Sequence, residues 1–412
     1  MVAEVKRPAE AADATDTPVK KRYILAGLLA SSMSLFAQRI ATPYSKKKLR
    51  QTDVQVLFSY YTQDNNHSAV TGGIGTEDLQ VYAPQVSMDT GNDSTTVYHV
   101  DAGVDIITSA STDNIDFVRS SASRIDARTH LNVGFNHRIR NTGTSYGVNG
   151  GLSIESDYFS RSIGVSVNHA VSPSREFSVS FQTFFDDLRW GRLHNGKPQK
   201  LIYPAELRST QWFTVHNRNS FNFALGWYET INTRMAIGIY PGVIYQTGLL
   251  STPFHRVYFT DKSERVESLP TQRLKFPLGI QLNTFIGSRY ILRSYYRFYW
   301  DDYGISAHTL NLELAIKTSY AFSLTPFVRL YKQTQANYFN PYGENDAMQE
   351  FYTSDYDLSK FTSYKTGLAL RYTPVSSRFR EMEIRYAYYK RSDGLEAHMI
   401  TTYFDIRYDK RK

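Results

Sequence analysis

Apolar and polar residues alternate with a period of two along most of this chain. The segment YILRSYYRFYWDD (290–302) is one example: Tyr296 and Trp300 share one parity, whereas Arg293 and Arg297 share the other. Successive side chains of a β-strand point to opposite faces, so this segment is expected to form a strand with one aromatic and one charged face. In a soluble sandwich the charged face lies on the open surface, and in a membrane barrel it lines the lumen.

Roughly sixteen such segments are expected as strands. They cover residues 51–62, 78–89, 95–108, 127–138, 145–156, 161–170, 175–186, 219–230, 234–246, 272–286, 289–302, 305–318, 321–335, 359–373, 380–391 and 397–409. Strands of soluble proteins usually have about 5–6 residues, whereas a tilted membrane strand needs about 9–11. The lengths of these segments therefore favour membrane strands.

The connections between the expected strands differ in length according to which side they lie on. The long ones, at about 63–77, 109–126, 187–218, 247–271 and 336–358, all follow odd-numbered strands, and the connections after even-numbered strands are short. Outer-membrane barrels have this arrangement, with short periplasmic turns and long external loops. Because backbone groups in a bilayer must be satisfied internally, we expect one all-β, transmembrane, antiparallel up-and-down barrel of roughly 16 strands.

The composition agrees with this fold and excludes several kinds of site and partner. The chain has 31 Tyr and 24 Phe, residue types that favour strands and membrane interfaces. It has no cysteine, which excludes disulfides, thiolate metal sites and cysteine nucleophiles. The net charge of +8 is spread along the chain, so no nucleic-acid partner is expected.

The N-terminal region has the pattern of an export signal. Lys20, Lys21 and Arg22 precede the short apolar stretch Tyr23–Ala37, and Gln38 follows it. A basic segment before a short apolar core is typical of a secretory signal peptide, and the apolar core is too short to be a retained membrane helix. A buried core helix is the alternative. We expect a leader and cleaved signal peptide over 1–37, a periplasmic segment over 38–50 and the barrel over 51–412.

Several stretches, in order along the chain, resemble an exported family of Gram-negative bacteria, the domain of unknown function 3570. The matching stretches are TDNIDFVRSSASRIDAR (112–128), GLLSTPFHRVYF (248–259), LPTQR (269–273), YRFYWDDYGI (296–305), LTPFVRLYKQTQANYF (324–339) and TSDYDLS (353–359). The resemblance implies an outer-membrane barrel without an established activity. It also implies an envelope redox or metal context, since such proteins are often encoded beside a small lipoprotein, a thioredoxin-like protein and a flavin transferase.

Parity along the expected strands selects a set of charged residues for the inner face of the barrel. They are Asp101, Asp105, Arg128, Glu155, Arg293, Arg297, Glu313, Arg329, Arg371, Glu383, Arg385, Asp405 and Arg407. These side chains are expected either to line a hydrated pore whose charge selects solutes, or to plug the lumen with ion pairs. Sixteen strands usually leave an aqueous passage, which favours the pore.

Catalytic and metal-binding patterns are weak. Ser306 and His308 share a strand face, as do His99 and Asp101, but geometry rather than spacing defines a catalytic site. The chain has no glycine-rich phosphate loop and no HExxH motif, so no catalytic residue, metal site or cofactor is expected.

The sequence therefore favours a channel or transporter for a small polar solute in the outer membrane of a Gram-negative bacterium. The first alternative is an interaction or assembly protein that uses the barrel as an anchor. A lipid hydrolase that uses Ser306 and His308 is the second. Outer-membrane lipid, lipopolysaccharide, the barrel-assembly machinery and a small periplasmic or lipoprotein partner are the expected contacts.

Overall fold

The computed structural model describes residues 51–64, 79–91, 95–109, 125–155, 158–188, 192–194, 197–199, 217–251, 256–375 and 378–409. Sixteen long strands form the barrel wall: β1 (Gln51–Gln63), β2 (Leu79–Gly91), β3 (Thr96–Ser109), β4 (Ile125–Arg138), β5 (Thr144–Glu155), β6 (Tyr158–Ser172), β7 (Arg175–Leu188), β10 (Asn217–Asn232), β11 (Met235–Gly248), β14 (Gln272–Ile286), β15 (Tyr290–Asp301), β16 (Ser306–Lys317), β17 (Phe322–Gln333), β18 (Phe361–Tyr372), β19 (Phe379–Arg391) and β20 (Glu396–Asp409). Each of the sixteen expected segments coincides with one of these strands. The leader (1–37) and the periplasmic segment (38–50) lie outside the described residues.

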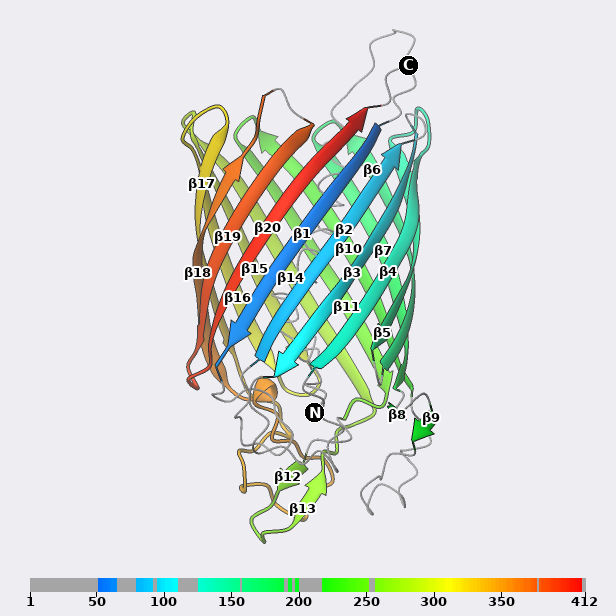
Figure 1. Ribbon diagram of the computed structural model, residues 1–412, viewed down its shortest axis with the longest axis vertical. Coiled ribbons are helices and arrows are strands. Elements are labelled where there is room, and N and C mark those ends of the chain that lie inside the picture. Colours follow the sequence, from blue (N-terminus) through cyan, green and yellow to red (C-terminus); the bar gives the residue numbers. More distant parts are fainter. Residues whose placement is uncertain are drawn as a thin grey trace.

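The sixteen strands close into one antiparallel barrel in sequence order (Figure 1). Each strand pairs with the wall strands before and after it, and β1 pairs with β20 from Gln51↔Asp409 to Gln63↔Ala397. This last pairing leaves no open sheet edge, as a barrel in a bilayer requires. The prediction of an up-and-down barrel of sixteen strands is confirmed.

The two ends of the barrel differ as the loop lengths predicted. The long connections, after β1, β3, β7, β11 and β17, all lie at one end, which we call the long-loop end. Figure 1 shows the hairpin of β12 (Arg256–Tyr258) and β13 (Glu264–Val266) beyond that end, and the short strands β8 (Arg192–His194) and β9 (Lys197–Gln199) pair there as well. Turns at the opposite end are short, which makes it the short-turn end.

The convex face of the barrel carries an apolar band between two rings of aromatic residues. Exposed residues in the band include Val133, Val165 and Leu225, which lie in the middle of their strands. Aromatic pairs towards the long-loop end are Tyr60–Tyr82, Phe276–Trp300 and Tyr364–Tyr388, and those towards the short-turn end include Phe135–Tyr146 and Phe322–Tyr372. A membrane barrel has this pattern, because aromatic rings favour the two lipid–water interfaces.

Helical structure in the described residues is limited to one turn of 3-10 helix, η2 (Tyr356–Leu358), and none of it is long and apolar enough to span a membrane.

Two of the long loops fold together into a compact unit at the rim, which we call the cap (residues 256–271 and 334–360). Backbone bridges join Phe259 to Asn345 and Ser268 to Tyr352, so the two loops contact each other directly. The buried Glu267 accepts a hydrogen bond of 2.5 Å from the Thr353 hydroxyl. These contacts tie together segments that lie some eighty residues apart in the sequence.

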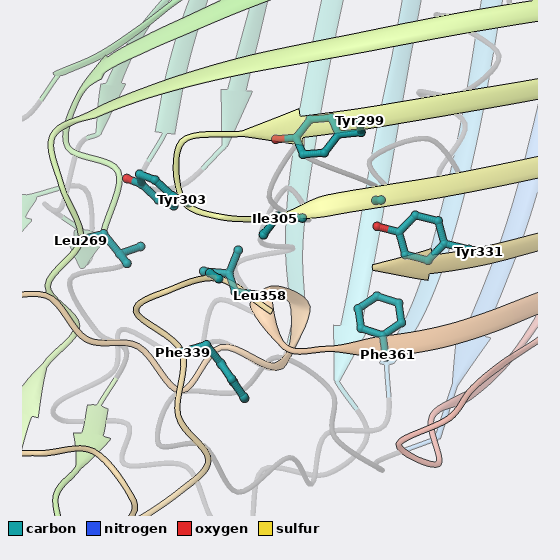
Figure 2. Close-up of a cluster of buried hydrophobic side chains, with 10 residues drawn as sticks. Leu269, Tyr299, Tyr303, Ile305, Tyr331, Phe339, Leu358 and Phe361 are labelled. Atoms are coloured by element: carbon teal, nitrogen blue, oxygen red, sulfur yellow. The ribbon is translucent and has the colours of Figure 1, made fainter. Parts of the chain in front are cut away.

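A hydrophobic cluster attaches the cap to the barrel wall. Figure 2 shows Leu269 and Leu358 of the cap beside Ile305 and Tyr303 of the turn between β15 and β16. The Tyr303 hydroxyl donates a 2.7 Å hydrogen bond to the Pro270 carbonyl, and burial raises the pKa of Tyr303, so that this donor keeps its proton. The cap therefore packs against the rim of β14–β18 through apolar contacts as well as hydrogen bonds.

Candidate functional site

The concave face of the barrel is identified by contacts between strands that are not neighbours. Arg385 of β19 and Glu313 of β16 form an ion pair of 3.0 Å, although β17 and β18 lie between them. Side chains on a closed barrel converge only on the inside, so this pair marks the concave face. The Arg385 guanidinium also lies 4.6 Å from the centre of the Phe327 ring of β17. Every second residue from these three positions shares their face.

A network of ion pairs covers the concave face of β16–β19. Arg385 bonds Glu383 at 3.3 Å as well as Glu313. Arg371 of β18 bonds Glu383 at 3.0 Å and Glu381 at 3.2 Å. Two guanidinium groups and three carboxylates thus form one continuous chain. The chain fixes these side chains against the wall, because each additional charge-assisted bond restricts the rotamers of its partners.

Arginine–carboxylate pairs also occur on both sides of this network. Arg293 of β15 lies 3.7 Å from Glu313. Across the seam where the barrel closes, Arg407 of β20 bonds Asp53 of β1 at 2.8 Å. Arg380 lies 3.6 Å from both Asp53 and Asp405. A register shift between Phe379 and Glu381 accompanies this last contact, and such a bulge redirects the side chain beside it.

Polar contacts continue onto β2–β5. The Asp101 carboxylate accepts hydrogen bonds from Gln85 and Ser87, both at 2.5 Å. Its expected neighbour His99 bonds Asp89 and Asn136 instead. Three further residues of the expected set lie nearer the long-loop end: Asp105 is directly opposite Arg128 in the register, Arg128 donates to the Ser153 hydroxyl at 3.0 Å, and Glu155 ends β5.

The middle of the opposite wall, on β5 and β6, is lined by small and uncharged residues. Gly147, Gly151 and Gly164 alternate there with serine and amide side chains. A Cβ added at Gly151 would collide with the side-chain oxygen of Asn132, and one at Gly147 with that of Asn136. The glycines therefore let the amides of the neighbouring strand lie flat against the wall. The flat, uncharged middle of this wall lies across the barrel from the ion-pair network of β16–β19.

Two of the expected arginines, together with one lysine, lie closer to the long-loop end than the ion-pair network. In the register, Arg293 is opposite Glu313, so Arg297, two residues further along, has the same face. Arg329 is two residues from Phe327 and directly opposite Lys365. Arg329 is buried, and its guanidinium lies 6.0 Å from the centre of the Tyr331 ring. Arg297 forms no ion pair or side-chain hydrogen bond with any residue that the structure describes.

Sequence reasoning missed several members of this charged face. Asp53, Glu381 and Lys365 have the inward parity of their strands, so the alternation that selected the other residues would have included them. Arg380 has the outward parity and reaches the concave face only because of the bulge at Phe379–Glu381. No local sequence pattern predicts that bulge. The lumen-lining role of the expected set remains a prediction, argued from these contacts.

The candidate hydrolase residues lie on the convex face. Ser306 is opposite Trp300 in the register, and the exposed His308 is opposite Phe298. The Nδ1 atom of His308 bonds the Tyr296 hydroxyl at 2.7 Å, and no hydrogen bond joins His308 to Ser306 in the described structure. Among the described residues, no three His, Asp or Glu side chains are placed to hold a metal ion.

Comparison with known proteins identifies a family. A family model described as "Protein of unknown function (DUF3570)" matches residues 25–401, which confirms the resemblance seen in the sequence. No curated protein matches the chain.

Solved barrels are similar at low identity. OprD of Pseudomonas aeruginosa has 9% identity and a TM-score of 0.40, over 89% of this chain and 98% of OprD. OpdK of the same organism, solved with vanillate, has 9% identity and a TM-score of 0.41, over 88% of this chain and 100% of OpdK. A bacterial polysaccharide outer membrane secretin has 8% identity and a TM-score of 0.47, over 87% of this chain and 98% of the secretin. At these sequence identities and TM-scores, the similarity gives no information about the solute or the partners of this chain.

Proposed function

The chain belongs to the DUF3570 family, whose function is unknown, and from its own fold we propose that it is an outer-membrane channel or transporter for a small polar solute. One observation carries this proposal: a closed barrel of sixteen strands has a concave face that is polar or charged on all sides. Barrels of about this strand number usually leave an aqueous passage. The ion pairs of β16–β19 lie against their own wall and glycines keep β5 and β6 flat, an arrangement that favours an open lumen over a plugged one.

The location and contacts follow from the same reasoning and are proposals too. An apolar convex band between two aromatic rings fits a bilayer, and barrels of this kind belong to the outer membrane of Gram-negative bacteria. The convex face would contact lipid and lipopolysaccharide after export through a cleaved signal peptide and insertion by the barrel-assembly machinery.

Channel activity is tested by conductance. Full-length protein, refolded and checked by heat-modifiable gel migration, is expected to give discrete conductance steps in a planar lipid bilayer. Folded protein that inserts into the bilayer without conducting would contradict the proposal.

The cap supports a second candidate function. The two loop segments of the cap form one ordered unit, and distinctive structure in loops often serves recognition. An interaction or assembly protein without transport activity is the alternative. Either its loops or its periplasmic N-terminal segment (38–50) would engage a small lipoprotein or periplasmic partner. Cross-linking in cells followed by mass spectrometry, together with absence of conductance, would favour it.

The lipid hydrolase has less support, because Ser306 and His308 are not joined and His308 bonds a tyrosine hydroxyl. A lipid-hydrolysis assay on wild type and Ser306→Ala tests it, and equal activity at background level is expected.

A further inference from the structure

Three tyrosines gather on the concave face of β10, β11 and β15, and we call them the tyrosine platform (Tyr228, Tyr240 and Tyr295). Tyr295 has the inward parity of β15 and is directly opposite Gln281 of β14. Gln281 is opposite Gly238 of β11, which is opposite Tyr228 of β10. Tyr240 is two residues from Gly238 and shares its face. With about 4.8 Å between neighbouring strands, the row from β10 to β15 is about 14 Å wide.

Two glycines let the platform lie close to the wall. A Cβ added at Gly238 would lie 2.7 Å from the Cζ atom of Tyr240. One added at Gly279 would lie 2.6 Å from the Tyr295 hydroxyl oxygen and 3.1 Å from the ring of Tyr295. Both tyrosine side chains therefore fill the space that another side chain would need, and they lie along the sheet instead of projecting across the lumen. All three tyrosines of the platform keep part of their surface accessible. The result is a low aromatic surface beside an open passage.

Hydrogen-bonding groups border these rings. The Tyr240 hydroxyl lies 3.5 Å from the Oε1 atom of Gln281, and the Gln281 amide donates to Asn283 at 3.3 Å. The hydroxyls of Tyr228 and Tyr295 form no hydrogen bond with any residue that the structure describes. A tyrosine hydroxyl can both donate and accept. The platform therefore offers hydroxyl donors and acceptors directly beside aromatic carbon.

The charged residues at the edges of the platform have opposite signs. Glu176 of β7 is directly opposite Tyr228, and Arg297 of β15 is directly opposite Gly279. One carboxylate and one guanidinium give these edges no net charge, so the platform suits a neutral solute better than an ion. The carboxylate accepts hydrogen bonds and the guanidinium donates them, and a hydroxyl group can pair with either.

Resting on the proposed function, we propose that the tyrosine platform binds the solute in the lumen and that the solute is a neutral carbohydrate. A sugar ring has a face of C–H groups and a rim of hydroxyls. The C–H face packs on an aromatic ring, whose π face carries partial negative charge, and the hydroxyls bond Tyr228, Tyr295 and Gln281. Sites for small molecules commonly combine aromatic contact with a few placed polar groups. Three rings contact more than one sugar unit, so an oligosaccharide fits better than a monosaccharide.

The test compares Tyr240→Leu and Tyr240→Phe with a matched control, Tyr245→Leu. Tyr245 lies on the same strand but on the convex face, where it is 36% exposed. In planar bilayers, the neutral trisaccharides maltotriose and cellotriose are expected to interrupt the ionic current of the wild type. Tyr240→Leu is expected to raise their half-blocking concentration about tenfold, because it removes the aromatic ring. Tyr240→Phe keeps the ring and is expected to raise it by no more than about threefold. Tyr245→Leu is expected to match the wild type.

Failure of the carbohydrate site can be told apart from failure of the channel. If the wild type conducts and neither trisaccharide blocks it, or both block Tyr240→Leu equally well, the carbohydrate site is wrong and the channel stands. Block by benzoate, a planar aromatic anion, without block by either trisaccharide would also overturn the carbohydrate assignment.

If folded wild type does not conduct, the channel is wrong, and calorimetric titration of the folded protein with maltotriose and cellotriose decides the site. Heat of binding that Tyr240→Leu removes and Tyr245→Leu retains would support the carbohydrate site. No binding, or equal binding to all three proteins, would overturn it. Tyr295→Leu gives a second, independent variant should Tyr240→Leu fail to fold.

Discussion

Adjacent residues on a wall strand face lipid and lumen in turn. The same substitution at two neighbouring positions is therefore expected to affect stability very differently. Val165 lies mid-strand on the convex face of β6 and is 48% exposed, whereas Ser166 faces inward beside Gly147. Val165→Arg is expected to destabilise the folded barrel by about 2–4 kcal/mol, the range for arginine at the bilayer midplane. Ser166→Arg is expected to be nearly neutral, because its charge reaches water in the lumen.

The measurement is urea unfolding in lipid vesicles, followed by heat-modifiable migration. Equal tolerance of the two substitutions would mean that β6 is not a membrane strand. Loss of folding for Ser166→Arg alone would exchange the inner and outer faces.

The ion-pair network makes a second prediction at the residue scale. Arg385→Met leaves Glu313 and Glu383 without their shared guanidinium. The expected cost is about 1–3 kcal/mol of unfolding free energy, below the range for a fully buried pair because water reaches these side chains. Adding Glu313→Gln to Arg385→Met should recover part of the loss, since the carboxylate that has lost its 3.0 Å partner is then removed. A double-mutant cycle measures this coupling, and additive losses would show that the pair contributes nothing.

Among the elements, the cap is the one whose stability can be separated from that of the barrel. Leu358 is 2% exposed and packs in the cluster of Figure 2. Leu358→Ala is expected to cost about 2–5 kcal/mol locally, the usual range for a buried leucine. Because the barrel wall does not depend on this contact, limited proteolysis should cut within 334–360 faster, while heat-modifiable migration stays unchanged.

Met348→Ala is the control, since this side chain of the same loop is 90% exposed. A cleavage rate for Leu358→Ala that equals the control would mean that the cap is not a cooperative unit.

For the whole molecule, the orientation in the membrane is the main prediction. The chain has no cysteine, so single cysteines report position without background. Met348→Cys lies in the cap at the long-loop end, and Tyr320→Cys lies in the fully exposed short turn between β16 and β17. A membrane-impermeant maleimide is expected to label Met348→Cys on intact cells and Tyr320→Cys only after the outer membrane is permeabilised. The reverse pattern would invert the topology.

The sequence alone determined the strands, their faces and the end at which the loops gather. Each of these follows from a pattern along one segment: a period of two fixes the faces of a strand, as in Arg293 and Tyr296, and loop length is a property of the chain between strands. Even the resemblance to the family rested on short stretches read in order. These patterns are local to one segment. They predict the folded structure correctly because every strand of a barrel keeps its alternation of inward and outward side chains.

The tertiary structure decided which inward residues meet. Arg385 pairs with Glu313 three strands away, Arg380 turns inward at a bulge, and two distant loops join through Glu267 and Thr353. No pattern along a single strand predicts these contacts. They depend on the register of each strand with its neighbour and on the curvature that brings non-neighbouring strands together. The same reason applies to Arg297. Parity placed it inside, but only the positions of the surrounding carboxylates could show that it has no ion-pair partner among the residues that the structure describes.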